Sequence, residues 1–265
     1  MLQRLSSVLL CILPVMSLVS CSVKEDRETC PCVLVLDFSK VDNGLLTSLN
    51  LSVAGPDGIL CQDVVQEDFY VKEYRVAVPK GGVMLNVYSF PGDESYGMLN
   101  ADGDVLEIPE GCECPPVYMH SVEIDTRKEI HRETVVPLKN FCRLSIEMVS
   151  DGYSPYILEI NGNVNGYGHD GFPKEGNFAF VPETDENGCC TVNIPRQKDS
   201  SLRLRICDED GVLKDFAVGE YIVAMGYDWS QKELDDVEII IDYAKTDITL
   251  IVDDWEKTMQ FDVII

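Results

Sequence analysis

The stretch FCRLSIEMV, residues 141–149, alternates almost without interruption between apolar and polar side chains. Its apolar positions include Leu144, Ile146 and Met148, and the residues between them are arginine, serine and glutamate. A period of two residues is typical of a β-strand with one buried face and one solvated face. The stretch therefore predicts a strand that lies on the core of a sheet.

The same period recurs along most of the chain. Further alternating stretches lie at 34–38, 74–78, 83–87, 202–206 and 237–243. Clusters rich in Gly, Pro, Asp and Asn stand between them, such as GPDG at 55–58 and DEDG at 208–211, and such clusters favour turns. No long apolar stripe of helical period is present, although short helices are expected near 40–50 or 121–131. The pattern predicts an all-β protein built from antiparallel β-sandwiches.

The length of the chain predicts two sandwich domains. About 240 residues remain after the candidate signal sequence, which is large for one sandwich and sufficient for two. Pro137 ends one strand, and a new alternating stretch starts near Phe141. We therefore expect an N-terminal β-sandwich at 32–139 and a C-terminal β-sandwich at 140–265.

The N-terminal segment has the features of a bacterial lipoprotein signal. Arg4 precedes an uncharged apolar run at 8–19, which is too short to span a bilayer. The run ends in LVSC, residues 18–21, which resembles a lipobox, and charged residues follow at once. We expect a signal peptide at 1–20, a lipidated Cys21 and a short tether at 21–31. The alternative is an ordinary secretory signal with an incidental cysteine. No later stretch is apolar and long enough to span a membrane.

The composition is acidic and rich in cysteine. There are 46 Asp and Glu against 21 Lys and Arg, a formal net charge of −25. A field of this sign disfavours binding to nucleic acid and to anionic lipid headgroups. Nine of the eleven cysteines follow Cys21. Export makes disulfides plausible, for example between CPC at 30–32 and CEC at 112–114, but the sequence leaves the connectivity open.

No group of residues indicates catalysis or metal binding. His120, His131 and His169 are scattered, whereas a metal centre needs clustered ligands. NGNVNG at 161–166 has the rhythm of a calcium-binding loop, but Phe172 stands where the bidentate glutamate is needed. Nucleophile-elbow, phosphate-loop and dinucleotide-binding motifs are absent from the sequence. We therefore expect a protein that is not an enzyme and that holds no cofactor or metal.

The end of the sequence is a further alternating stretch. Met259, Phe261, Val263 and Ile265 would share one face of a strand. Such a strand either completes the protein's own sheet or pairs with the open edge of a neighbouring protein. These four residues are the candidate partner-binding site.

Several stretches, taken in order, resemble a known family. They are the lipobox, the acidic tether, CPCVLVLDFSKV (30–41), YRVAVPKGGVMLNVYSFPG (74–92), RETVVPLKNFCRLSIEMV (132–149), ILEINGNVNGYGHDG (157–171) and ITLIVDDWEKTMQFDVII (248–265). Together they resemble the fimbrial anchor lipoproteins of Bacteroidetes, which are Mfa2-like, FimB-like and related to fimbrillins.

This resemblance implies a structural role at the cell surface. It implies two transthyretin-like β-sandwich domains, an outer-membrane attachment through Cys21, and no enzymatic activity. The partners would be fimbrillin stalk or accessory subunits of a fimbria (pilus) that assembles by strand exchange. The protein would hold the fibre on the cell and help limit its length. Arg27 lies in the tether, where the proteolysis that matures stalk subunits would release the protein, so an anchor should escape that cut.

A second hypothesis is a surface glycan-binding lipoprotein, which would also have a lipobox and sandwich domains. It requires an exposed aromatic platform, and Trp229 or a nearby tyrosine is the candidate. Core packing is the favoured interpretation for both Trp229 and Trp255.

Overall fold

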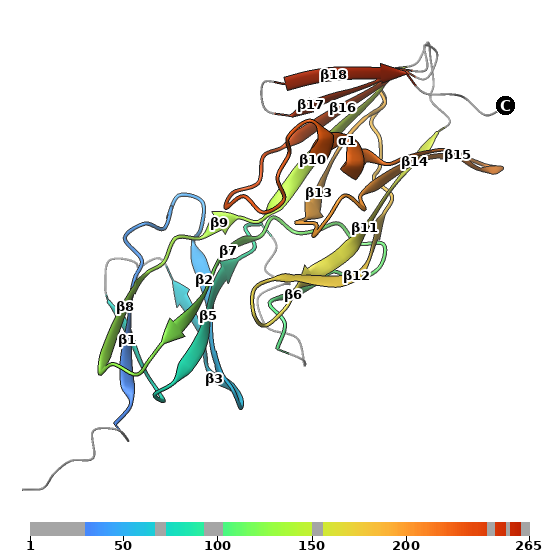
Figure 1. Ribbon diagram of the computed structural model, residues 1–265. Coiled ribbons are helices and arrows are strands. Elements are labelled where there is room, and N and C mark those ends of the chain that lie inside the picture. The colour runs from blue at the N-terminus through green and yellow to red at the C-terminus, as the bar shows by residue number, and fades with distance from the viewer. Residues whose placement is uncertain are drawn as a thin grey trace, which may run out of the picture.

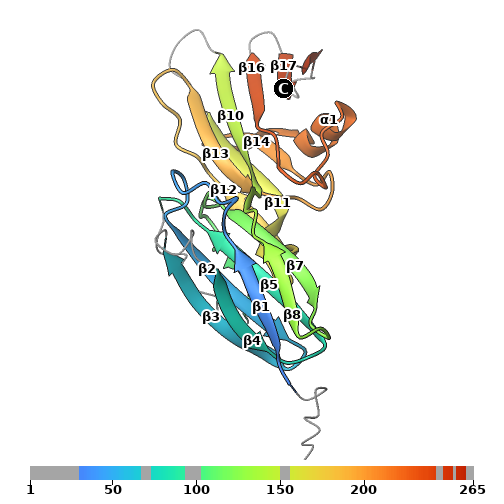
Figure 2. The same ribbon diagram turned by 90° about the vertical axis from the view of Figure 1, so that its left-hand side faces the viewer.

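The computed structural model describes residues 30–66, 73–92, 103–149, 156–242, 247–252 and 255–260. Within these ranges the chain forms eighteen β-strands and one short helix, α1 (Val218–Ala224). No helix in these ranges has the length and apolar character needed to cross a membrane. The prediction of an all-β protein is confirmed, and the molecule is elongated (Figures 1 and 2).

Two sheets form the half of the molecule that contains the start of the described chain. The three-stranded sheet has the order β4 (Tyr74–Val78), β1 (Cys32–Asp37), β8 (Ile130–Thr134). The five-stranded sheet has the order β3 (Gly58–Gln66), β2 (Ser48–Gly55), β5 (Gly82–Ser89), β7 (Tyr118–Asp125), β9 (Leu138–Lys139). Both sheets contribute to one buried cluster, which includes Leu34, Leu36, Leu51 and Leu85. This arrangement is a β-sandwich.

Two further sheets form the other half. One has the order β13 (Cys189–Pro195), β10 (Phe141–Val149), β16 (Val237–Asp242), β17 (Asp247–Val252), β18 (Trp255–Gln260). The other has the order β12 (Pro173–Phe180), β11 (Ile157–Tyr167), β14 (Arg203–Asp208), β15 (Gly211–Phe216), and β6 (Leu106–Glu107) pairs with β11. Their shared core includes Ile146, Ile160, Leu204 and Ile239.

The strand directions differ in part from the expected antiparallel sandwiches. Most neighbours are antiparallel, but β1 pairs in parallel with β8, and β10 pairs in parallel with β16. Strands β1 and β10 thus each lie between one antiparallel and one parallel neighbour. The expected short helices are also wrong: residues 121–131 belong to β7, β8 and the turn between them, and 40–50 holds turns and the start of β2.

Contacts between the two halves are built from a loop and a buried amide. The Asn86 side chain of β5 donates a hydrogen bond to the His169 carbonyl at 2.7 Å and accepts one from the Ser121 hydroxyl at 2.7 Å. Gly171 has a φ of +75°, and a Cβ atom there would lie 2.2 Å from the Ser121 oxygen. The buried core of the second half also includes Tyr88 of β5 and Met119 of β7, which belong to the first half. The expected limits of the domains stay predictions.

Candidate functional site

The structure describes only part of the predicted site. Cys21, Phe261, Val263 and Ile265 lie outside the described residues. The backbone of Met259 belongs to β18 and lies opposite Ile248 of β17. The terminal strand therefore begins at Trp255, four residues before the predicted set, and it pairs with the protein's own sheet.

Strand β18 is an edge strand whose core-facing side is partly uncovered. Within the described ranges it pairs only with β17. Opposite residues of an antiparallel pair lie on the same face. Lys257 lies opposite Leu250, which is fully buried, yet Lys257 itself is exposed. The outer face carries Thr249 and Thr258, whose hydroxyl oxygens are 2.9 Å apart. The outer backbone groups of β18 can therefore accept another strand.

The opposite edge of the same sheet is covered. The Glu113 side chain accepts a hydrogen bond from the Asn193 amide of β13 at 2.7 Å, and the Cys114 amide donates to the Asn193 carbonyl at 3.3 Å. In the facing sheet, the Gly111 amide donates to the Ala179 carbonyl of β12 at 3.1 Å. Residues 111–114 thus contact both of these edges, whereas no residue in the described part of the chain pairs with the outer side of β18.

A second accessible edge, β3, was missed by the sequence analysis. This nine-residue strand pairs only with β2 in the described part of the chain, and it exposes Ile59, Leu60 and Val64. Long edge strands with exposed apolar side chains are prone to pair with other chains. The signal that could have found it is the GPDG turn, because Gly55 and Gly58 are paired across a two-residue hairpin loop.

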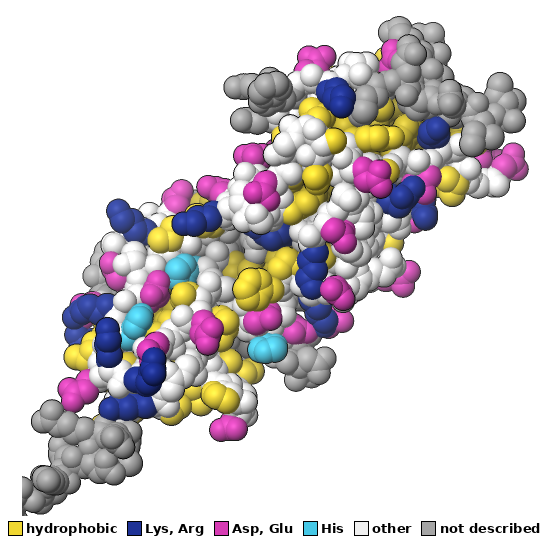
Figure 3. Space-filling model, in the orientation of Figure 1, with side chains coloured by type: hydrophobic (Ala, Val, Ile, Leu, Met, Phe, Trp, Pro, Cys, Tyr) yellow, Lys and Arg dark blue, Asp and Glu magenta, His cyan; other side chains and the backbone are white. Residues whose placement is uncertain are grey.

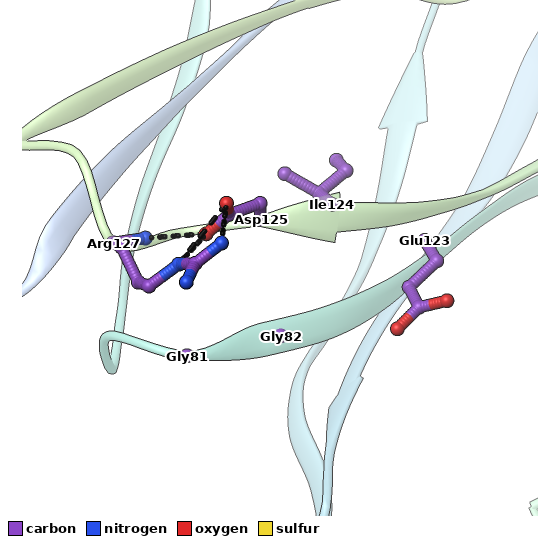
Figure 4. Close-up of a pocket in the computed structure, with 6 residues that line it drawn as sticks. All are labelled: Gly81, Gly82, Glu123, Ile124, Asp125 and Arg127. Atoms are coloured by element: carbon purple, nitrogen blue, oxygen red, sulfur yellow. Dashed lines mark hydrogen bonds and ion pairs between the residues drawn. The ribbon is translucent and has the colours of Figure 1, made fainter.

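The structure also contains a surface hollow of about 450 Å³ at the turn ends of β5 and β7. Its lining residues are Gly81, Gly82, Glu123, Ile124, Asp125 and Arg127 (Figure 4). The Arg127 guanidinium folds back onto Asp125 at 2.6 Å and lowers the pKa of that carboxyl. Figure 4 shows Glu123 directed away from this pair. The hollow therefore offers charge but no nucleophile paired with a base.

The histidines and asparagines singled out in the sequence have structural surroundings. His120 and His131 both approach Glu133, with Nε2–Oε distances of 3.5 and 3.4 Å, and burial lowers the pKa of His120. No three or more His, Cys, Asp or Glu side chains in the described ranges are placed to hold a metal ion. The stretch 161–166 lies within β11 instead of a loop, and Asn163 donates to Asp199.

Trp229 cannot form the exposed aromatic platform that the glycan hypothesis required. Its side chain is only 6% exposed, and it packs edge-on against Tyr227 with ring centroids 4.7 Å apart. The platform prediction for Trp229 is therefore wrong, and the prediction of core packing is confirmed. The side chain of Trp255 lies outside the described residues.

The cysteines form no disulfide in the described part of the chain. The bridge between CPC and CEC that the sequence left open is not observed in these residues. Burial raises the pKa of the Cys142 thiol to about 12 and that of Cys190 to about 11. Because the thiolate is the reactive form, these two side chains behave as packing residues.

Comparison with known proteins supports the fold. No known family profile matches the sequence, and no curated protein sequence matches it. Among solved structures, the fimbrial anchor protein Mfa2 from Porphyromonas gingivalis aligns with a TM-score of 0.60 and 12% identity, over 86% of this chain and 99% of that one.

Two Bacteroides structures align in the same way. A protein from Bacteroides thetaiotaomicron, named as a candidate polysaccharide-binding protein, has a TM-score of 0.61 and 13% identity over 86% of this chain and 98% of that one. A candidate adhesin from Bacteroides ovatus has a TM-score of 0.54 and 15% identity over 87% and 95%. At such identities the likeness concerns the fold: this chain has the β-sandwich fold of the Bacteroidetes fimbrial anchor Mfa2.

Proposed function

We propose that the protein is a lipid-anchored subunit of the outer membrane that attaches a fimbria to the cell and helps limit its length. Its contact with fimbrillin stalk subunits would be a strand exchange. The observation that carries this proposal is the accessible edge of β18, on a fold shared with a fimbrial anchor protein. The role is structural, and it requires neither a cofactor nor catalysis.

The positions of the two chain ends suit an anchor. The start of β1 lies at one end of the long axis, and β18 lies toward the other (Figure 1). A chain from Cys21 to Cys30 spans at most about 31 Å when fully extended. A lipid on Cys21 would therefore hold the first half of the molecule close to the membrane and leave β18 directed away from it.

The organisation of the chain follows from this role. The signal peptide would occupy 1–20 and the lipidated tether 21–31, followed by sandwich domains at 32–139 and 140–265. Met259, Phe261, Val263 and Ile265 would belong to the partner-binding strand, because Met259 already lies opposite the buried Ile248. A partner strand that adds to β18 would gain backbone hydrogen bonds along an edge that the fold leaves accessible.

Gene deletion is the first test of the anchor function. Cells that lack the protein should shed their fimbriae into the medium or bear fibres of altered length, as seen by electron microscopy. A Cys21→Ala variant should leave the outer-membrane fraction. Attached fibres of normal length in the deletion strain would contradict the proposal.

A truncation after Val252 tests the partner-binding edge. It removes β18 and the residues beyond it, and it exposes β17 as the new edge. Fimbrial subunits should then no longer co-purify with the protein. A matched control is Val64→Lys on the other accessible edge, β3, which should leave that co-purification unchanged.

Glycan binding is the second candidate function. One observation favours it: Phe172, in the loop at 168–172, is 66% exposed and lies next to His169 and Asp170. An exposed aromatic ring with polar neighbours is a common stacking surface for a sugar. A glycan array should show binding that Phe172→Ala abolishes, and an array without any binding would exclude this function for the sugars tested.

A further inference from the structure

The charge of the protein is distributed unevenly along its long axis. Three turns lie at the same end as the start of β1, and we call this the basal end. They are the turns at 55–58, 79–82 and 126–129. The Thr126 amide donates to the Gly81 carbonyl at 3.0 Å, and the Val33 amide, near the start of β1, donates to the Glu129 carbonyl at 2.8 Å. These bonds join the turns at 79–82 and 126–129 to the start of β1 in one surface.

The basal end has almost no net charge in a strongly acidic protein. The turns at 55–58 and 79–82 and the segment 123–130 together contain three Lys or Arg and four Asp or Glu. Their net charge is −1, so −24 of the formal −25 is carried elsewhere. At the opposite end, the turns at 181–188 and 208–211 contain six carboxylates and no Lys or Arg. Figure 3 shows Lys and Arg side chains gathered at the basal end, at the lower left of the view.

The basal turns carry three basic side chains, one of which, Arg127, is paired with Asp125. Lys80, Arg127 and Lys128 lie on two adjacent turns, and Ile130, at the start of β8, is 55% exposed. Gly81 has open space where a Cβ would lie, so the backbone of this turn can approach another surface closely. Basic side chains around an exposed apolar residue are typical of proteins that rest in the interfacial region of a membrane.

We propose that the basal end binds directly to anionic headgroups of the membrane, in addition to the lipid on Cys21. This inference rests on the proposed attachment through Cys21. The tether at 21–31 would hold Lys80, Arg127 and Lys128 close to the membrane, where even a weak contact is populated because the local concentration is high.

The same charge distribution orients the molecule. Exposed charges farther than about 8 Å from the surface are largely screened at physiological salt, so the distant carboxylates do not cancel the basal contact. When the molecule tilts, the acidic turns at 181–188 and 208–211 approach the anionic surface and are repelled. The membrane therefore holds the long axis upright and keeps β18 directed outward.

The test uses the unacylated chain beginning at Ser22, mixed with phosphatidylcholine vesicles with and without phosphatidylglycerol. Flotation should show binding to the vesicles that contain phosphatidylglycerol, and high salt should abolish it. The variant with Lys80→Gln, Arg127→Gln and Lys128→Gln should bind at least tenfold more weakly, since each basic residue near an anionic surface contributes roughly fivefold. Circular dichroism checks that the variant remains folded.

A matched control distinguishes an effect of the basal surface from an effect of the protein's net charge. The variant with Lys198→Gln, Lys232→Gln and Lys257→Gln has the same net charge as the basal variant, but its changes lie in the other half. It should bind vesicles as the wild type does. Glu123→Gln, at the basal hollow, should instead strengthen binding about threefold, because it removes a negative charge near the surface.

Two results would overturn the inference. One is equal binding of the wild-type chain to vesicles with and without phosphatidylglycerol. The other is an equal loss of binding in the basal variant and in the matched control. Neither result depends on acylation of Cys21 or on fimbriae, so failure here is distinct from failure of the anchor function, which fractionation and microscopy test in cells.

Discussion

Replacing Arg196 should destabilise the protein more than replacing any exposed arginine. Its guanidinium is largely buried, and burial lowers its pKa. It donates to the Asn140 side chain and to the Trp229 carbonyl, and to the Gln231 and Lys232 carbonyls at 2.7 and 3.3 Å. One side chain therefore joins the start of β10 to the segment that leads into β16.

The magnitude follows from the acceptors that lose their donor. Arg196→Met keeps most of the aliphatic volume but removes every hydrogen bond of the guanidinium. A buried acceptor left without a donor costs about 1–3 kcal/mol. At least two of the four acceptors would be left without a donor. Part of this loss is offset because the variant no longer buries a charged group. We expect the free energy of unfolding to fall by about 3 kcal/mol, which for a chain of this length lowers Tm by roughly 6–12 °C.

Thermal and urea unfolding, followed by circular dichroism, measure this effect. The matched control is Arg127→Met, because Arg127 is exposed and its ion pair with Asp125 lies in solvent. Such surface pairs contribute less than about 1 kcal/mol. If Arg196→Met costs no more than Arg127→Met, the idea that Arg196 fixes these segments is refuted.

Three further predictions concern the contact between the halves, the pH dependence and the thiols. Gly171→Ala should cost at least about 2 kcal/mol in urea unfolding, because its φ is positive and its Cβ would collide with Ser121. Because burial lowers the pKa of His120, the unfolded chain binds more protons, so stability should fall as the pH drops below about 6.5; His120→Gln should flatten that slope in acid titrations. An aromatic disulfide reagent should modify the exposed Cys30 quickly at pH 8 and Cys142 only on unfolding, since burial raises the pKa of Cys142 to about 12.

The strands predicted from the sequence are those in which apolar, core-facing side chains alternate with polar ones along a single segment. The stretches at 34–38, 74–78, 83–87 and 202–206 correspond to β1, β4, β5 and β14, with ends shifted by at most two residues. FCRLSIEMV is β10, residue for residue. In each case the period of two is sufficient, because the side chains that reach the core lie every second residue along one segment.

The features that were missed depend on neighbours that are distant in sequence. Nothing in 34–38 indicates that β1 pairs in parallel with β8, about a hundred residues later. Strand β3 is mostly exposed, so its apolar residues show no buried period. The asparagines of 161–166 have the rhythm of a calcium-binding loop, yet they lie in β11, where the register shifts around Val164 accommodate the irregular stretch.

The candidate site shows the same division between local and distant signals. A lipobox is a local motif, and Cys21 could be proposed from four residues. Whether an edge strand can bind a partner depends instead on which residues cover its outer side. Strands β13 and β18 border the same sheet, but Glu113 and Cys114 cover β13 at Asn193, whereas β18 lacks such a cover in the described part of the chain. No property of either strand's own sequence distinguishes these outcomes.

The proposed anchor would transmit force from its partner to the membrane, and polar contacts between the two halves would bear part of that force. A pull on β18 would act through β17 on β16 and β10, and the Asn86 bond to the loop at 168–172 would share the load with the backbone link at residue 140. Hydrogen bonds loaded together resist more force than the same bonds broken one at a time. Variants that loosen this path, such as Gly171→Ala, should therefore weaken fibre attachment in cells even where the protein still reaches the membrane.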